Sequence, residues 1–344
     1  CAPPRKTRRR TMRDLSISVH FARSVLKHAV ERGLDPISLL RKNRNSPRLL
    51  LEENARVSVE RFADLQVSTM LAMQDEALGY ADRRMPIGCW SMMCHAVIGS
   101  ENLGQALARF CRFYQLFEFG VHPHLEEQEE VAVIRLEQVD RAKKADPYLT
   151  ELVLFNVHRF SSWLVQEHLP ILRVELGYPP VARPGDYRHM FLGNPVEFDC
   201  DTTRMTLGRE MLEKRVTQDE ASLRRFLRHP VLNMLTGSYA SDSWTAKVRE
   251  LVHHRLADMP ELKEVAASLE VHPQTLRRRL ATEGTTFKDI KNQVRRDTAL
   301  HFLGKQGLSI EEIAYRSGFS ESSAFIRAFK VWTGVTPYTY RKGL

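Results

Sequence analysis

Two segments near the end of the chain, residues 261–284 and 309–334, most strongly restrict what it can fold into. In each, apolar residues recur at helical spacing and are interrupted by a few turn residues. These apolar residues are Leu262, Val265, Ala266, Leu269, Leu276 and Leu280 in the first segment, and Ile310, Ile313, Ala314, Phe325 and Phe329 in the second. The pattern predicts two short helices meeting at an angle in each segment, with Ala266 and Ala314 small enough to let them cross closely. We therefore expect two helix-turn-helix units.

The stretch between the two units, residues 287–303, predicts one long helix. Its core positions would be Ile290, Val294, Ala299 and Phe302. At 1.5 Å per residue such a helix spans about 25 Å. With its flanking turns, that length is comparable to the ~34 Å between successive major-groove faces of B-DNA. One chain would then contact two adjacent grooves.

The basic residues of this 344-residue chain are concentrated at its two ends. Of a formal charge of +9, residues 1–13 contribute six basic and no acidic groups, and residues 260–344 contribute fourteen basic against nine acidic groups. The remaining residues, 14–259, therefore carry a slight excess of acidic groups. A basic C-terminal region is expected of a protein that binds phosphates, although a solvated basic face would have the same composition.

Residues 244–344 resemble the DNA-binding domain of the AraC/XylS family of bacterial transcription regulators. The motifs that carry the resemblance are Val265-Ala-Ala-Ser-Leu269, Thr275-Leu-Arg-Arg-Arg-Leu280, Glu283-Gly-Thr-Thr-Phe287, Ile313-Ala-Tyr-Arg-Ser-Gly-Phe319, Ser323-Ala-Phe-Ile-Arg-Ala-Phe329 and Trp332-Thr-Gly-Val-Thr-Pro337. Two positions depart from the family pattern, because Glu270 replaces a turn glycine and His272 replaces a capping serine. A left-handed Glu270 would cost ~1 kcal/mol, and His272 would cap its helix less well.

The resemblance implies which side chains contact DNA. It assigns base contacts to Gln274, Arg277 and Arg278 on the first recognition helix, and to Glu321, Ser322, Ser323 and Arg327 on the second. The chemistry of the first helix agrees, because Arg bonds guanine and Gln bonds adenine through two hydrogen bonds each. Phosphate contacts are expected from Arg279, Lys330, Arg341 and Lys342. The alternative for the arginine run is a solvated basic face, since consecutive residues point in different directions around a helix.

The middle of the chain predicts an α+β domain. Helical spacing covers residues 16–32, a short stretch after Pro36, and residues 58–78, 100–117 (capped by Ser100) and 148–168. Alternating patterns predict strands at residues 118–124, 131–137, 171–177, 196–198 and 204–207, with an acidic turn at 126–130. A further helix would begin with a capping box of Thr217 and Glu220 and run towards Met234. The expected fold is thus an α+β sensing domain, with helices and a small mostly antiparallel sheet, followed by an all-α DNA-binding domain.

Four regions are expected along the chain. Residues 1–13 would be a disordered basic arm; with no apolar run after the charges, they do not resemble a secretory signal, and Met12 is an alternative natural start. Residues 14–236 would form the sensing and dimerisation domain, residues 237–243 a polar linker, and residues 244–344 the DNA-binding domain, whose first helix Ser243 would cap.

Residues 14–236 loosely resemble the arabinose-binding-type domain of one branch of the same family. The resemblance implies a small-molecule effector and self-association, but it does not assign the ligand. Trp90, His95, Arg112 and Tyr114 are candidate effector contacts, with core packing or a structural hydrogen bond as the alternative for each. We expect no cofactor and no metal site, because the five cysteines lack a CxxC or Cys/His ligand spacing and suit reduced thiols.

The combined prediction is a cytoplasmic, effector-responsive transcription activator. It would bind promoter DNA, act as a homodimer, contact RNA polymerase, and have no catalytic activity and no membrane segment. One alternative is an enzyme or metabolite-binding module tethered to DNA by the C-terminal domain, and another is a ligand-independent architectural DNA binder. Within the DNA-binding domain, we expect the first unit to supply more of the sequence discrimination and the second more of the rigid attachment.

Overall fold

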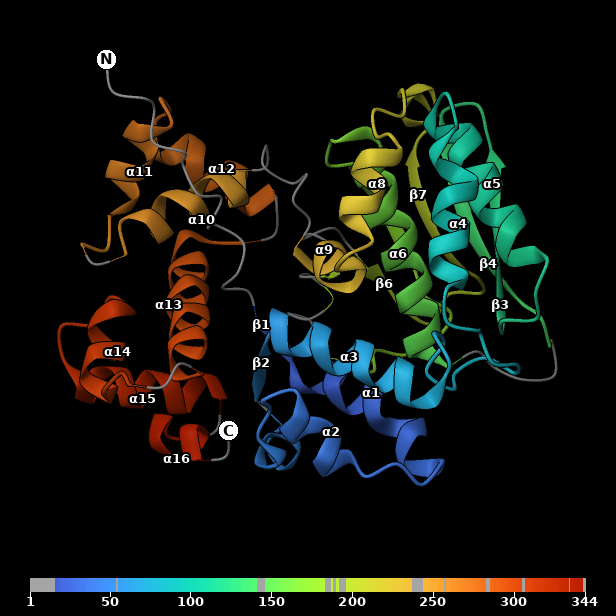
Figure 1. Ribbon diagram of the computed structural model, residues 1–344. Helices are drawn as coiled ribbons and strands as arrows, with labels where there is room; N and C mark the ends of the chain where they lie inside the picture. The colour runs from blue at the N-terminus through green and yellow to red at the C-terminus, as the bar shows by residue number, and fades with distance from the viewer. Residues whose placement is uncertain are drawn as a thin grey trace, which may run out of the picture.

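The computed structural model describes residues 16–53, 55–140, 146–182, 187, 190, 191, 196–236, 244–256, 258–282, 285–304, 307–333 and 335–342. The predicted basic arm, the predicted linker and the predicted cap Ser243 lie outside these residues. Figure 1 shows an N-terminal part of helices around a sheet and a C-terminal part made of helices alone. Among the described residues, no helix is both long and apolar enough to cross a membrane.

The N-terminal part begins with a two-stranded antiparallel sheet that the sequence analysis did not predict. Strand β1 (Ser16–Ser18) pairs with β2 (Arg56–Ser58), with Ile17 opposite Val57. Each strand leads directly into a helix whose N-cap is the last serine of the strand. The helices of this region are α1 (Val19–Glu31), α2 (Pro36–Lys42), a 3-10 helix (Pro47–Leu51) and α3 (Val59–Met73). The expectation that a helix begins at residue 16 was wrong, because residues 16–18 are paired as a strand.

Helix α3 ends at Met73, five residues before its predicted end. Gln74 adopts a left-handed conformation, with φ of 52°. The carboxylate of Asp75 then accepts hydrogen bonds from the backbone N–H groups of Ala77, Gly79 and Met85, each at 3.0 Å. These bonds stabilise a compact loop in place of the last predicted helical turn.

A five-stranded sheet forms the centre of the N-terminal part. Its order is β3 (Val121–Glu127), β4 (Val131–Gln138), β7 (Thr203–Gly208), β5 (Ile171–Glu175) and β6 (Val196–Glu197). All neighbours are antiparallel except β5 and β6, so the prediction of a small, mostly antiparallel sheet is confirmed. Glu126 and Glu127 belong to β3 and not to a turn as predicted, because Glu126 pairs with Arg135 of the neighbouring strand.

Helices pack around this sheet and share its apolar core, which includes Phe110, Ile134, Leu154, Phe160 and Met205. They are α4 (Cys89–Ile98), α5 (Leu103–Gln115), α6 (Pro147–Val165), α8 (Glu220–Phe226) and α9 (Pro230–Thr236), with a 3-10 helix at Arg209–Glu213. Helix α4 was not predicted.

Two predicted helix starts were wrong by a few residues. Asn102 caps α5, since its side chain accepts a hydrogen bond from the Gln105 N–H, whereas the Ser100 hydroxyl lies 3.3 Å from an Arg109 nitrogen. The capping box of α8 pairs Asp219 with Ser222.

Thr217 lies outside α8 because its N–H and its hydroxyl both donate to the Leu164 carbonyl of α6. The single helix predicted to run towards Met234 is divided into α8 and α9 before Pro230, whose ring and missing N–H prevent an unbroken helix.

The C-terminal part contains the two predicted helix-turn-helix units. Its helices are α10 (Trp244–His254), α11 (Leu262–Ser268), α12 (Pro273–Thr282), α13 (Phe287–Leu303), α14 (Ile310–Arg316), α15 (Ser322–Thr333) and α16 (Pro337–Lys342). Helix α13 has the predicted bounds. Ala266 and Ala314 are buried, as their place at the helix crossings requires.

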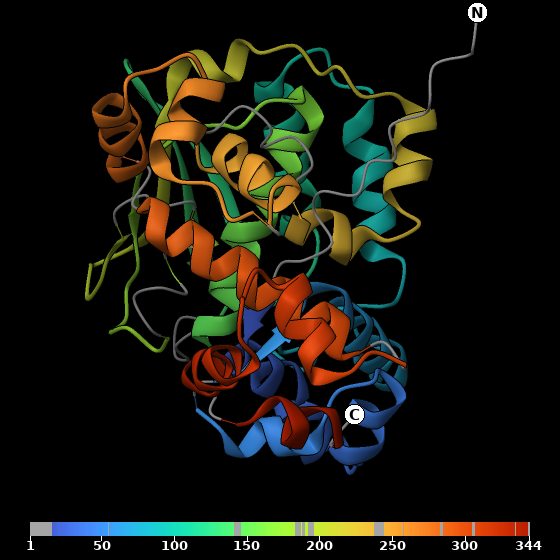
Figure 2. The same cartoon turned by 90° about the vertical axis from the view of Figure 1, so that its left-hand side faces the viewer.

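The two units differ in what they pack against. The first unit has its own core, formed by α10–α12 and the beginning of α13. The second unit shares one continuous core with the N-terminal part, in which Leu300, Leu303 and Phe329 join Val57 and Phe62. Figures 1 and 2 both show α13 and the second unit beside β1 and β2. The second helix-turn-helix unit is therefore anchored to the N-terminal domain.

Candidate nucleic-acid interface and effector pocket

The first recognition helix is α12, and its turn has the departures that the sequence indicates. Glu270 is left-handed, with φ of 54°. The Nδ1 atom of His272 accepts a hydrogen bond from the Gln274 N–H at 3.2 Å, so this ring caps the helix in place of a serine hydroxyl. The left-handed glutamate costs about 1 kcal/mol relative to glycine.

The predicted base-contacting residues of α12 lie on its exposed side. Gln274, Arg277 and Arg278 are all exposed. Arg277 Nη1 lies 3.4 Å from Gln274 Oε1, one helical turn away, so these two side chains share a face. Arg279 is half-buried, and its guanidinium lies 4.0 Å from the centre of the Trp244 ring on α10. The arginine run is thus divided between an exposed face and a contact inside the unit.

The second recognition helix is α15, and its unit is more regular. Gly318 supplies the left-handed turn with φ of 79°, and the predicted capping box of Ser309 and Glu312 is present in α14. Glu321, Ser323 and Arg327 are exposed, while Ser322 is half-buried. The Ser323 hydroxyl donates to Glu321 Oε2 at 3.3 Å. This face has fewer strong base-bonding groups than α12.

The predicted phosphate contacts differ in their surroundings. Lys330 and Lys342 are exposed, and Lys342 Nζ lies 4.9 Å from the Tyr338 ring centre. Arg341 is half-buried and its Nη1 donates to the Leu308 carbonyl at 2.7 Å. Arg341, like Arg279, therefore has a structural contact besides any contact with DNA.

Three arginines that sequence reasoning did not single out make structural contacts at α13, and two of them, Arg249 and Arg295, link α13 to the helix-turn-helix units. Arg249 of α10 forms an ion pair with the buried Asp297, and Arg296 lies 3.4 Å from the same carboxylate. Burial lowers the pKa of Arg296 to about 10. Arg295 Nη2 donates to the Gly318 carbonyl at 2.9 Å, and its guanidinium lies 4.7 Å from the Phe319 ring centre. These three arginines thus have a structural role, so not all basic residues of this region are available for DNA.

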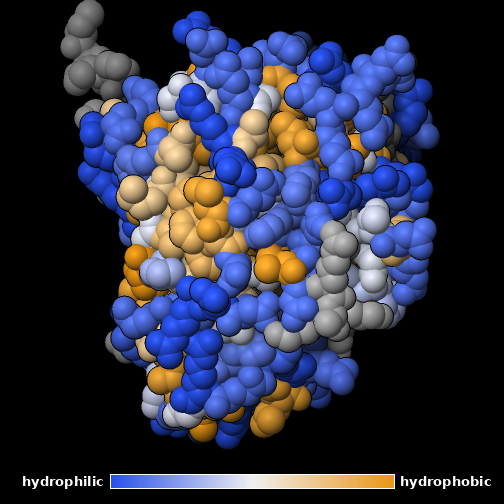
Figure 3. Space-filling model, turned by 90° about the vertical axis from the view of Figure 1, so that its right-hand side faces the viewer, coloured by the Kyte–Doolittle hydropathy of each residue, from blue (hydrophilic) through white to orange (hydrophobic). Residues whose placement is uncertain are grey.

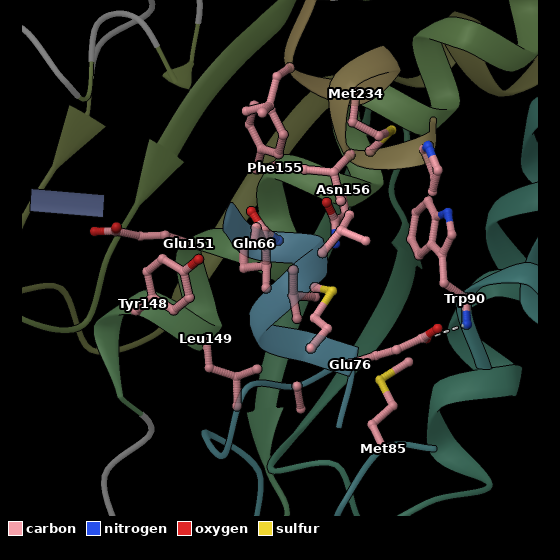
Figure 4. A pocket seen from close by; sticks show the side chains of 18 of the residues that line it. Gln66, Glu76, Met85, Trp90, Tyr148, Leu149, Glu151, Phe155, Asn156 and Met234 are labelled. Atoms are coloured by element: carbon pink, nitrogen blue, oxygen red, sulfur yellow. Dashed lines mark hydrogen bonds between the residues drawn. The ribbon is translucent and has the colours of Figure 1, made fainter. Parts of the chain in front are cut away.

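A cavity of about 270 Å³ lies in the N-terminal domain between β1, α1, α3, α4, α5, α6 and α9 (Figure 4). Its lining is mainly aliphatic and aromatic: Ile17, Phe21, Phe62, Val67, Met70, Leu71, Ala77, Met85, Ile87, Trp90, Tyr114, Phe119, Val121, Tyr148, Leu149, Leu152, Val153, Phe155, Met190, Pro230, Val231, Met234 and Leu235. Five further lining residues are polar: Gln66, Glu76, Glu151, Asn156 and Arg159.

Two of the four predicted effector contacts, Trp90 and Tyr114, line this cavity, and two do not. His95 is exposed on α4, with Nε2 at 3.4 Å from Glu220. Arg112 is exposed on α5 and lies two residues before Tyr114, which places it on the other side of that helix. Sequence reasoning missed the lining residues of α3 and α6, whose helical spacing resembles that of any core-facing helix.

The two carboxylates of the cavity lining already have partners. Both oxygens of Glu76 accept backbone N–H groups, from Gly88 and Trp90, each at 2.7 Å. Burial raises the pKa of Glu76. Glu151 lies 3.4 Å from the Tyr178 hydroxyl, and Figure 4 shows its carboxylate pointing away from the centre of the pocket.

One group of possible metal ligands occurs in the described part of the chain, formed by Glu175, Glu197 and Cys200. Arg204 forms an ion pair with Glu175, and Arg173 does so with Glu197. The arginines neutralise both carboxylates, so this arrangement is that of an ion-pair network on the sheet.

Comparison with known families decides the identity of both domains. Residues 33–216 match the family described as the arabinose-binding domain of AraC transcription regulator, N-terminal, and residues 265–343 match a helix-turn-helix domain. The chain belongs to the AraC family of transcription regulators. It is a DNA-binding transcription regulator, as the sequence predicted.

The chain is also similar to individual proteins named as regulators. The ornithine utilization regulator of Pseudomonas aeruginosa is 28% identical over 327 residues, which cover 95% of this chain and 96% of the relative. A helix-turn-helix-type transcriptional regulator of Mycobacterium bovis is 40% identical over 98 residues, 28% of each chain. The crystal structure of the transcriptional regulator CdpR from Pseudomonas aeruginosa is 22% identical, covers 89% of this chain and 96% of its own, and has a TM-score of 0.32, too low to support an argument.

Proposed function

We propose that this AraC-family protein is an effector-responsive activator that contacts two adjacent major grooves with α12 and α15. The observation that carries the proposal is that helix α3 both lines the cavity and contacts the DNA-binding domain. Phe62, Gln66 and Met70, one turn apart along this helix, line the cavity. The beginning of the same helix contacts the DNA-binding domain.

The contacts across the domains are specific. Glu60 Oε2 lies 3.9 Å from His301 Nδ1 of α13. The Arg61 guanidinium lies against Gly304, at the end of α13. Ile17 of β1 also lines the cavity, and β2 packs on α13. A ligand that shifts α3 or β1 would therefore change the position of the second helix-turn-helix unit, provided that it binds the two arrangements with different affinities.

On DNA, we propose base contacts from Gln274, Arg277 and Arg278 and from Glu321, Ser322, Ser323 and Arg327, with phosphate contacts from Lys330 and Lys342. The exposed face shared by Gln274 and Arg277 supports this assignment for α12. Arg279 and Arg341 would support the recognition surface through Trp244 and Leu308, in addition to the predicted phosphate contacts.

The test has two steps on the full chain. Selection from a random DNA pool should recover a site with two recognition sequences about one helical turn, roughly 10 bp, apart. Binding to that site, measured by fluorescence anisotropy, should then change when an effector found by thermal shift is added. Metabolites to try first include L-ornithine, after the name of the Pseudomonas relative, and L-arabinose, after the family description. No sequence preference would contradict the proposal, and turnover of a hit would favour the tethered enzyme.

We also propose that the regulator acts as a homodimer in the bacterial cytoplasm, contacts RNA polymerase, and has no catalytic activity. Apolar side chains are exposed on the sheet domain, among them Met92 of α4 and Leu116 after α5. Figure 3 shows that apolar side chains gather in one area of the face that carries these helices. Sedimentation equilibrium would test self-association, and a monomer at micromolar concentration would contradict it.

A further inference from the structure

We infer that the cavity takes an uncharged amphipathic molecule, with an apolar body and one amide, hydroxyl or carbonyl group held by the side chains of Gln66 and Asn156. The inference rests on the proposed function, because it treats the cavity as the effector site. It assigns a ligand class that differs from both metabolites named above.

The size and lining of the cavity favour a small apolar body. At about 270 Å³ it is slightly smaller than typical ligand pockets of roughly 300–1,000 Å³. Only five of its 28 lining residues carry an amide, carboxyl or guanidinium group. A sugar has hydroxyl groups on every side, and most of them would lose their hydrogen bonds to water without replacement, at a cost of about 1–3 kcal/mol each.

Two carboxamides of the cavity have no hydrogen-bond partner among the described residues. Gln66 is only 5% exposed, lies on α3 and lines the cavity. Asn156, on α6, lines it as well. Among the residues that the structure describes, neither side-chain amide makes a hydrogen bond with another protein group. A carboxamide offers a donor and an acceptor together, which suits a neutral polar group.

Each of the three charged side chains of the cavity contacts a protein group, although Glu151 Oε2 and Arg159 Nε make no hydrogen bond within the described part of the chain. Glu76 is bonded to two backbone N–H groups, and Glu151 lies beside Tyr178. The Arg159 guanidinium lies 5.2 Å from the Phe155 ring centre. An ionic group on the ligand would lose its hydration on entering this mainly apolar cavity, and burying an uncompensated charge costs several kcal/mol. An uncharged head group avoids that cost.

A series of probes with one tail and four head groups tests the ligand class on the full chain. The probes are octanamide, 1-octanol, octanoate and octylamine, with L-arabinose and L-ornithine beside them. We expect octanamide and 1-octanol to raise the melting temperature, and titration calorimetry to show octanamide binding at least tenfold more tightly than octanoate or octylamine. Gln66→Leu and Asn156→Leu should each weaken octanamide binding about tenfold.

Gln128→Leu is the matched control, because Gln128 is exposed in the turn between β3 and β4, and it should leave octanamide binding unchanged. The melting temperature of each variant without ligand shows whether it folds, and two independent variants keep the test valid if one does not. Equal or tighter binding of a charged probe, or no binding of octanamide, would overturn the inference.

The same experiment separates this inference from the proposed function. If L-ornithine or L-arabinose binds and changes DNA affinity while octanamide does not bind, the ligand class is wrong and the effector-responsive regulator stands. If octanamide binds through Gln66 and Asn156 but no ligand alters DNA affinity, the ligand class stands and the proposed regulation fails.

Discussion

Arg61 of α3 and Gly304 at the end of α13 are in direct contact across the two domains. A methyl group built onto Gly304 would lie 1.6 Å from Arg61 Nη2. Arg61 also lies near the buried Tyr340 hydroxyl, where burial raises the pKa of the tyrosine and the positive charge of Arg61 opposes that rise. The absence of a side chain at residue 304 therefore lets the end of the Arg61 side chain lie against the end of α13.

Gly304→Ala should loosen this contact. The backbone at Gly304 is right-handed, with φ of −81° and ψ of −4°, so alanine brings no backbone strain and acts only through its methyl group. Because the added methyl group meets only the flexible end of the half-buried Arg61 side chain, moving that side chain should cost less than the roughly 1–3 kcal/mol of overpacking a rigid core. We expect a lower melting temperature and, because the second unit is less constrained, a changed affinity for the selected DNA site, measured by differential scanning calorimetry and anisotropy.

Gly99→Ala is the control for that experiment. Gly99 also ends a helix with right-handed angles, φ of −84° and ψ of 15°, but no atom lies within 4 Å of its added methyl group. This substitution should be neutral or stabilising by about 0.4–1 kcal/mol through the unfolded state. If the two variants gain equal stability, the contact between Arg61 and Gly304 does not constrain the domains.

Arg277→Ala should weaken binding to the selected site by ~1–3 kcal/mol and relax the preference at one base pair. Lys330→Ala should weaken binding to all DNA sequences alike. It should also reduce the steepness of the plot of log K against log salt concentration by about one. Anisotropy titrations on selected and scrambled DNA at several salt concentrations would measure both. An equal loss on the two DNAs for Arg277→Ala would remove this residue from the base contacts.

Ser322→Ala compares the two units. Because α15 offers serine and glutamate where α12 offers arginine and glutamine, the loss of sequence preference should be smaller than for Arg277→Ala. Comparable losses would contradict the expectation that α12 supplies more of the discrimination.

Glu270→Gly should stabilise the protein by ~1 kcal/mol, because glycine adopts the left-handed conformation of residue 270 without strain. Gly318→Ala at the equivalent turn should destabilise the protein, since φ is 79° and the added methyl group would lie 2.7 Å from the Leu256 carbonyl oxygen. Chemical denaturation of both variants would measure the two changes in unfolding free energy. A destabilised Glu270→Gly protein would show that Glu270 makes a compensating contact.

The sequence predicted best the elements whose pattern is local. Helix α13 has the predicted bounds because apolar residues repeat along its whole length and Thr286 caps its start. Strands β1 and β2 could not be predicted, because three residues carry no clear alternation and their pairing joins segments about forty residues apart. Helix α4 is rich in Met, Cys and Trp and so lacks the polar face that would mark a helix.

The cavity was harder to predict than the recognition helices. A recognition helix is one continuous segment, so the positions of Gln274 and Arg277 follow from helical spacing. The cavity combines six helices from Val19 to Thr236, and the two amides without a partner among the described residues lie 90 residues apart in the chain. Trp90 and Tyr114 were found by residue type, but nothing in the sequence distinguishes Gln66 or Asn156 from other polar residues of amphipathic helices.

The buried His158 should make the protein less stable as the pH falls below about 6. Its Nε2 lies 2.8 Å from the Leu169 carbonyl oxygen, and the His168 ring lies 5.7 Å from its own. Burial, with smaller contributions from Arg159 and His168, lowers the pKa of His158 to about 3. In the unfolded chain its pKa is about 6.5, so between these values the unfolded state binds the extra proton.

Stability should therefore be lost on acidification from pH 6.5 towards pH 3, by at most about 1.4 kcal/mol per pH unit from this residue. His158→Gln removes the titration and keeps a side-chain donor for the Leu169 carbonyl. Between pH 6.5 and 5, urea denaturation should show a smaller loss of unfolding free energy for this variant than for the unmodified protein. The contribution of the other histidines cancels when the losses of the two proteins are subtracted. Parallel curves for the two proteins would mean that His158 accepts its proton in the folded state, and that the end of α6 opens to water.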